Sequence, residues 1–188
     1  LAAIQLEAAR EHREGPPFTV FCGNNVGYFG PHEQTLRSRP GAYEAHWQGC
    51  RAGISTIGIE SDGTVKACPS LPTAPYDGGN VRSLSLAALW QRSDAIRFAR
   101  DRTSDELWGH CRDCYYADIC RGGCSWMAHC TLGRRGNNPF CYYRVKQLQR
   151  RGLRERLVLR QRAPERPYDF GRYEIVEAPG RDDDDAAA

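Results

Sequence analysis

The sequence feature that most constrains the fold is a run of cysteines between residues 111 and 124. Four of the nine cysteines fall here with the spacing C-x2-C-x5-C-x3-C, and they are Cys111, Cys114, Cys120 and Cys124. Thiolates at such spacing bring soft ligands to a metal from one short loop, and zinc and iron–sulfur clusters are the centres that prefer sulfur. The run therefore predicts metal binding and leaves the metal open.

The number and grouping of the cysteines favour metal over disulfides. Nine is an odd number, so a disulfide framework would leave one cysteine over. Clustered C-x2-C spacing suits a metal better, and reduced thiols are typical of the cytosol. We therefore expect a cytoplasmic metal-binding protein rather than a secreted disulfide-bonded one.

The overall composition is that of a soluble globular protein. With 188 residues the chain has room for one or two domains, and 40% of its residues are hydrophobic and 26% charged. No apolar run approaches the roughly 20 residues of a membrane span, so no membrane partner is expected. The net charge of +3 comes from scattered arginines, densest at residues 150–162, which favours a solvated face over a nucleic-acid surface.

The first segment of the chain has the pattern of one α/β unit. Residues 1–14 are rich in helix formers and predict the end of a helix. Residues 18–22 form a β-branched and aromatic run that predicts a buried strand, and a Gly-Asn-Asn loop follows. One such unit cannot form a sheet alone, so residues 1–45 are expected to end a domain whose earlier part precedes Leu1.

A β-hairpin is predicted around the Asp-Gly pair at 62–63. Residues 55–60 and 65–68 are short strand-like runs on either side of this pair. A hairpin there would bring Cys50 and Cys68 near one another, ready to share a metal.

Three helices are predicted from apolar spacing and capping residues. They cover residues 83–90, 94–101 and 140–151. Ser83 or Ser85 can cap the first of them.

The other segments have weaker signals. Residues 26–49 are expected to be a loop, and residues 153–159 fit either a helical turn or a strand. The chain is polar from Gln161 onward, with a disordered acidic tail expected at 182–188.

Seven cysteines and one glycine form a single pattern along the chain. They are, in order, Cys50, Gly63, Cys68, Cys111, Cys114, Cys120, Cys124 and Cys141. This pattern resembles the SPASM domain, the auxiliary-cluster domain of radical S-adenosylmethionine (SAM) enzymes. The resemblance covers about residues 46–145, and it includes the Arg-Gly-Gly-Cys step at 121–124 and the segment 80–90.

The resemblance implies two 4Fe–4S clusters with interleaved ligands. The first auxiliary cluster would take Cys50, Cys68 and Cys124. The second would take Cys111, Cys114, Cys120 and Cys141. Clusters held in this way would cross-link a domain with a small core, and Gly122 and Gly123 would let backbone amides approach the sulfurs.

The first cluster would lack one protein ligand. Fully ligated relatives carry an eighth cysteine soon after the first, and residues 51–57 contain none. One iron would then be open or held by another side chain. The candidates are His46, His110 and His129. Cys22 and Cys130 lie outside the pattern; we expect Cys22 to be a buried small residue and rank Cys130 below the seven as a ligand.

Two further departures bear on activity. Pro69 follows Cys68 where sulfatase-maturating relatives carry an acidic residue that serves as base, which weakens the case for formylglycine formation. The chain also lacks the C-x3-C-x2-C loop of a radical SAM cluster, so we expect it to be inactive by itself, and no catalytic residue is assigned. If residues 1–30 end a radical SAM barrel, Asn24 and Asn25 are weak candidates for contact with SAM or substrate.

The sequence therefore predicts an α+β fold. Residues 1–45 would be the last α/β unit of a truncated (β/α) barrel, 46–152 a SPASM domain with a hairpin and helices around two clusters, and 153–188 a C-terminal extension. The expected function is the iron–sulfur auxiliary domain of a radical SAM maturase, which engages a peptide or small-molecule substrate and exchanges electrons with an external donor or acceptor. SAM and a third 4Fe–4S cluster would belong to the full-length enzyme. The alternative is a structural zinc-binding interaction module that uses the four cysteines at 111–124.

Overall fold

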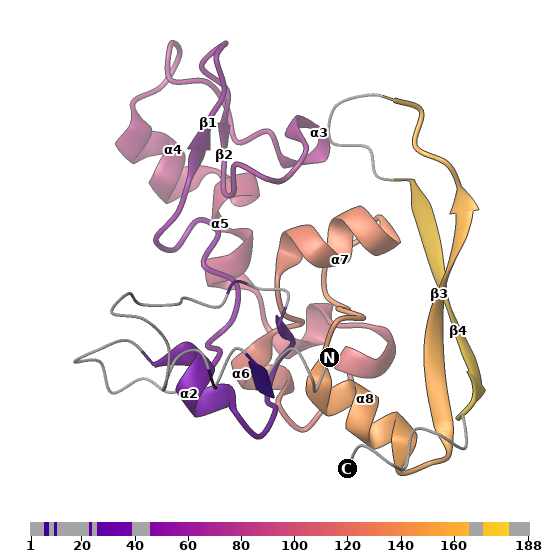
Figure 1. Cartoon of the computed structure of the whole chain (residues 1–188). Coiled ribbons are helices and arrows are strands. Elements are labelled where there is room, and N and C mark those ends of the chain that lie inside the picture. The colour runs from indigo at the N-terminus through magenta and orange to yellow at the C-terminus, as the bar shows by residue number, and fades with distance from the viewer. Residues whose placement is uncertain are drawn as a thin grey trace. The chain divides into compact units, whose positions relative to one another are not determined.

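The computed structural model describes residues 6–7, 10, 23, 26–38, 46–165 and 171–180 (Figure 1). Within it the chain divides into two compact units, which we describe separately. The first unit comprises Leu1–Gln48, Pro139–Val158 and Glu174–Ala188, and the second comprises Gly49–Asn138 and Leu159–Tyr173. The strand predicted at 18–22 and most of the helix predicted at 1–14 lie outside the described residues.

The predicted hairpin opens the second unit. Strand β1 (Gly58–Ile59) pairs antiparallel with β2 (Val65–Lys66), with Gly58 opposite Lys66 and Ile59 opposite Val65. The carboxylate of Asp62 accepts a hydrogen bond from the backbone N–H of Thr64 at 2.9 Å, and Gly63 has φ +90°, which favours glycine. The hairpin is thus confirmed, with a shorter paired ladder than its apolar pattern predicts.

Two of the predicted helices follow the hairpin. Helix α4 (Leu86–Arg92) begins after Ser85, whose hydroxyl accepts a hydrogen bond from the N–H of Ala88 at 3.2 Å. Helix α5 (Asp94–Asp101) has the predicted bounds and buries Ile96 and Phe98. Both helices are confirmed.

The core of the second unit consists of two small apolar clusters that these elements share with the short helix α3 (Thr73–Tyr76). The larger one contains Ala52, Ala67, Leu71, Tyr76, Phe98 and Ala99. The smaller one contains Val65, Leu89 and Ile96. The hairpin and the helices after it are therefore tied together by only a few large side chains.

The cysteine run folds into short helical pieces. These are η2 (Ser104–Glu106), η3 (Gly109–Cys111), α6 (Ala117–Cys120) and α7 (Ser125–Leu132). Arg121, Gly122 and Gly123 all have positive φ and reverse the chain between α6 and α7. Helix α7 was not predicted, because its apolar residues are spread around the helix instead of following one face.

The first unit contains helices α2 (Glu33–Arg37) and α8 (Tyr142–Gln149). The expectation of a loop throughout 26–49 is wrong at α2, where the Glu33 carboxylate accepts hydrogen bonds from the N–H groups of Phe29 and Trp47, both at 2.8 Å. Helix α8 is shorter than predicted, because Cys141 is its N-cap residue. Within the described part of the chain, no helix is long and apolar enough to cross a membrane.

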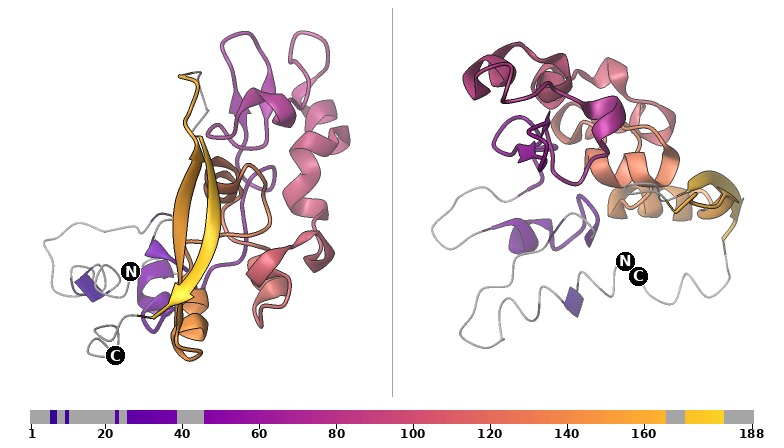
Figure 2. Two further views of the ribbon diagram at one scale, coloured as in Figure 1. Left: turned by 90° about the vertical axis from the view of Figure 1, so that its right-hand side faces the viewer. Right: turned by 90° about the horizontal axis from the view of Figure 1, so that it is seen from above.

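The last two strands are β3 (Leu153–Gln161) and β4 (Arg172–Pro179). They pair into a two-stranded sheet, which Figure 2 shows as a long twisted ribbon. Residues 153–159, which fitted either a helical turn or a strand, form part of strand β3. The expectation of an irregular polar chain after Gln161 is wrong at β4, where Tyr173 and Ile175 alternate with charged residues and mark a half-buried strand.

Candidate metal centre

The three cysteines predicted for the first cluster share one neighbourhood in the second unit. Cys50 and Cys68 pack against the larger apolar cluster. Cys124 is the N-cap residue of α7 and is 5% exposed. Burial above all, together with the nearby Cys50 and Cys68, raises the pKa of the Cys124 thiol to about 11. The hairpin and the loop before α7 thus bring three thiols within electrostatic reach of one another.

The raised pKa of Cys124 indicates which chemistry this thiol suits. A thiol with a pKa near 11 stays protonated at neutral pH and is a poor nucleophile. A metal ion supplies the positive charge that displaces such a proton. Cys124 therefore fits a buried metal ligand better than a reactive or disulfide-forming cysteine.

A buried guanidinium group lies beside these thiols. Arg102 is 3% exposed, and it donates hydrogen bonds to the carbonyl of Arg121 at 2.8 Å and to Ser125 Oγ at 3.3 Å. Its Nε is buried and finds no hydrogen-bond acceptor among the described residues. Burial lowers the pKa of Arg102, while the charge of Cys50 raises it. A buried cation with an unused donor fits a site that holds an anionic group.

A tyrosine and a histidine share a hydrogen bond near Cys50. Tyr76 Oη lies 3.0 Å from His129 Nδ1, and the two rings meet edge to face. Burial raises the pKa of Tyr76 and lowers that of His129, so both are neutral at pH 7. The charge of Cys50 also acts on the pKa of Tyr76. Of the histidines predicted as candidate ligands, His129 is thus linked through Tyr76 to the surroundings of Cys50.

Three of the four cysteines predicted for the second cluster lie in one short segment. Cys111 ends η3, Cys114 follows in a turn, and Cys120 ends α6 and is buried. The backbone N–H of Tyr116 donates a hydrogen bond to Cys114 Sγ at 3.4 Å. Amide donors of this kind favour a thiolate and tune the potential of a cluster that it binds.

The remaining predicted residues have different outcomes. Cys141 belongs to the first unit, where its thiol donates to the carbonyl of Tyr28 at 3.8 Å, so its grouping with the segment 111–120 stays a prediction. Cys130 lies within α7 and donates to the carbonyl of Met127 at 3.4 Å. Cys22, Asn24 and Asn25 lie outside the described residues.

The arrangement of the thiols differs from a site for a single ion. Across the ranges that the structure describes, no three His, Cys, Asp or Glu side chains are grouped as ligands of one metal ion. In a cluster each thiolate binds a different iron atom, so its ligands need not converge on one point. The four cysteines at 111–124 are accordingly not gathered around one zinc ion here.

Sequence reasoning did not identify Arg102, Arg135 or Tyr76 as part of this site. The Arg135 guanidinium lies 4.4 Å from the ring centroid of Phe98 and contributes to the pKa values of the other two residues. Nothing in the sequence separates these two arginines from the other cations of the chain. Gly122 also has a role that spacing did not reveal, because a Cβ there would lie 2.9 Å from the backbone of Gly136.

A small α+β unit with several thiols around its core, next to guanidinium groups, has the donor atoms that a thiolate-bound metal centre needs. Residues 50–115 match the family model of SPASM, described as an iron–sulfur cluster-binding domain. This segment of the chain therefore matches the SPASM family, as the cysteine pattern predicts.

Curated relatives match about half of the chain. An AdoMet-dependent heme synthase of Methanosarcina barkeri is 33% identical over 103 residues, which is 54% of this chain and 28% of the relative. A serine-type anaerobic sulfatase-maturating enzyme of Klebsiella pneumoniae is 34% identical over 92 residues, or 48% of this chain and 22% of the relative. A mycofactocin maturase of Mycolicibacterium smegmatis is 34% identical over 94 residues, or 49% and 23%. The matched region thus spans less than a third of each relative, and no solved structure matches the chain significantly.

Proposed function

We propose that this chain is the auxiliary iron–sulfur part of a radical SAM maturase and binds two 4Fe–4S clusters. The first cluster is held by Cys50, Cys68 and Cys124, and the second by Cys111, Cys114, Cys120 and Cys141. Clusters of this kind supply one-electron transfer when they are bound. SAM and a third cluster would belong to the radical SAM part of the full-length enzyme.

The observation that carries this proposal is the neighbourhood of Cys124. Its pKa of about 11 arises from burial and from Cys50 and Cys68, which lie far from it in sequence. The orphaned Nε of Arg102 supports an anionic occupant beside Cys50, because a buried donor without an acceptor is costly. Thiolate-ligated clusters have the negative charge that would satisfy it.

The chain's own residues have separate tasks in this proposal. Cys124 ties the hairpin to the loop between α6 and α7, and Cys141 ties α8 to the segment that begins at Cys111. The segment 111–124 is then shared between two redox centres. Tyr76 and His129 hold a neutral hydrogen-bonded pair beside the first centre, and Arg102 offsets its charge.

The names of the relatives support a proposal for the chemical class of the substrate. Two of the relatives are named as maturases, of a sulfatase and of mycofactocin, and another is named as a heme synthase. We propose a peptide or a small metabolite that is modified close to the first cluster. An external electron donor or acceptor then serves the second cluster.

Anaerobic reconstitution with iron and sulfide tests the proposal. We expect a brown protein with broad absorbance near ~400 nm and about eight irons per chain. A colourless protein that binds one zinc ion and no iron would refute the proposal and establish the structural zinc module. About four irons would refute the binding of two clusters.

A further inference from the structure

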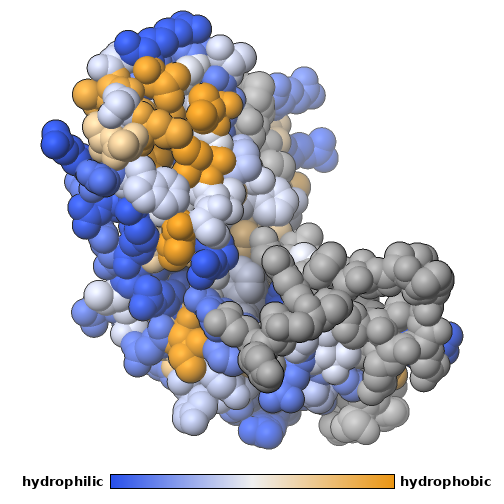
Figure 3. All heavy atoms as spheres, turned by 90° about the vertical axis from the view of Figure 1, so that its left-hand side faces the viewer, coloured by the Kyte–Doolittle hydropathy of each residue, from blue (hydrophilic) through white to orange (hydrophobic). Residues whose placement is uncertain are grey.

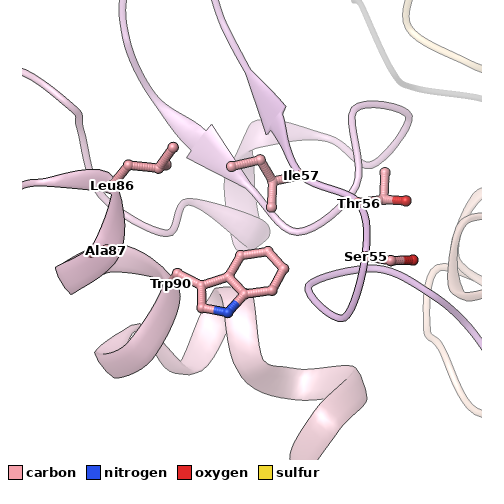
Figure 4. Close-up of a pocket in the computed structure, with 6 residues that line it drawn as sticks. All are labelled: Ser55, Thr56, Ile57, Leu86, Ala87 and Trp90. Atoms are coloured by element: carbon pink, nitrogen blue, oxygen red, sulfur yellow. The ribbon is translucent and has the colours of Figure 1, made fainter.

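A groove on the second unit lies between α4 and the residues that precede β1. It has a volume of about 440 Å³ and is lined by Ser55, Thr56, Ile57, Leu86, Ala87 and Trp90. Figure 4 shows the side chains of Ile57, Leu86 and Trp90 around a common space, with the two hydroxyl residues on one side. This volume accommodates one or two large side chains of a ligand.

The groove belongs to a larger apolar surface. Leu86 in the groove lining is 43% exposed, and Ile59 of β1 is 55% exposed. Figure 3 shows hydrophobic residues gathered at the top of one face and bordered by hydrophilic ones. A contiguous apolar surface with a polar rim is typical of an interaction site.

Two arginines contact residues that line the groove. The Arg100 guanidinium lies 4.8 Å from the ring centroid of Trp90 and donates to the Trp90 carbonyl. Arg51 Nε lies 3.3 Å from Ser55 Oγ. Among the residues that the structure places, neither arginine forms an ion pair, whereas Arg97 is paired with Asp101 at 2.9 Å.

These features together select one kind of ligand. The apolar lining at Ile57, Leu86 and Trp90 excludes a simple anion, because its burial there would be uncompensated. The positive charges of Arg51 and Arg100 select against a basic partner. We propose that the groove binds a peptide segment in which an aliphatic or aromatic anchor residue is flanked by aspartate or glutamate. The anchor fills the groove, and the flanking carboxylates face the two arginines.

Fluorescence anisotropy with labelled peptides tests this site on the iron-loaded chain. The probe is the peptide Asp-Glu-Leu-Glu-Phe-Glu-Asp, compared with one version in which serine replaces both apolar residues and another in which lysine replaces every acid. We expect each replacement to weaken binding about tenfold or more, since a buried anchor and matched charges both contribute.

Matched variants locate the binding within the groove. Leu86→Ser is expected to weaken binding of the acidic peptide about fivefold or more, whereas Leu84→Ser, which alters an exposed leucine outside the groove lining, should change it less than about twofold. Arg51→Gln should weaken binding of the acidic peptide and make that binding less dependent on salt concentration. It should have little effect on binding of the lysine version. Unchanged iron content verifies that each variant is folded.

Three results would overturn the proposal. They are equal binding of all three peptides, equal effects of the two leucine variants, and absence of binding at about 1 mM acidic peptide, where even a weak site is occupied. Each of these results can be observed while the chain still binds its full complement of iron. Failure of the peptide-binding proposal is therefore distinct from failure of the cluster assignment.

Discussion

The buried thiol of Cys124 gives a quantitative test of the site in the metal-free protein. Its pKa rises from 9.0 to about 11 in the folded chain, so between these values the folded state keeps a proton that the unfolded state has lost. The folded state binds more protons, and stability must therefore fall as pH rises through this range. The contribution is fully present below pH 9 and is lost by about pH 11.

The size of the effect follows from the shift in pKa. Each pKa unit corresponds to about 1.4 kcal/mol, so two units amount to about 3 kcal/mol when the thiol is fully ionised. Between pH 8 and pH 10 the expected loss in the free energy of unfolding is about 1 kcal/mol from this thiol alone. Replacement of Cys124 by alanine removes the titrating group and should remove this part of the pH dependence.

The measurement is urea unfolding of the metal-free, reduced protein at both pH values, followed by tryptophan fluorescence. Between pH 8 and pH 10, the free energy of unfolding of the wild type should fall by about 1 kcal/mol more than that of Cys124→Ala. The control is Leu89→Ala, which shortens a buried side chain that has no titrating group and should keep the wild-type pH dependence. If wild type and Cys124→Ala lost the same free energy, Cys124 would not be buried beside other thiols in the way described.

Three other predictions concern the clusters and the first unit. In the reconstituted chain, Cys124→Ala should remove about four of about eight irons and spare the second cluster, and joint loss of both iron sets from a folded variant would contradict the assignment. Arg102→Met should lower the reduction potential of the first cluster by tens of millivolts in a redox titration, because a nearby buried positive charge is lost; an unchanged potential would show that Arg102 is not close to it. Arg144 and Glu155 form a buried pair with two contacts of 2.6 Å. In urea unfolding, Arg144→Met should lower the free energy of unfolding by about 3–5 kcal/mol, and most of this loss should be regained when Glu155→Leu is added. If Arg144→Met were as stable as the wild type, the Arg144–Glu155 pair would not be buried as described.

Local sequence signals were sufficient where a segment determines its own conformation. The Asp-Gly pair at 62–63 predicted the hairpin because a side-chain cap and a positive φ are local properties. Ser85 predicted the start of α4, and the spacing of Ile96 and Phe98 predicted the inner face of α5, for the same reason. Strand β4 was missed because its signal of period two lies in a segment where prolines and charges dominate the composition.

The sequence by itself indicated the class of domain. Seven cysteines and Gly63 in register resemble the SPASM family, and the family model matches residues 50–115. Only the tertiary structure decided that Cys124 is desolvated beside Cys50 and Cys68 and that Arg102, rather than any other arginine, is buried next to them. Desolvation depends on which distant segments exclude water from a group, and no local pattern contains that information. The groove with Trp90 has the same origin, because its two walls come from segments about thirty residues apart.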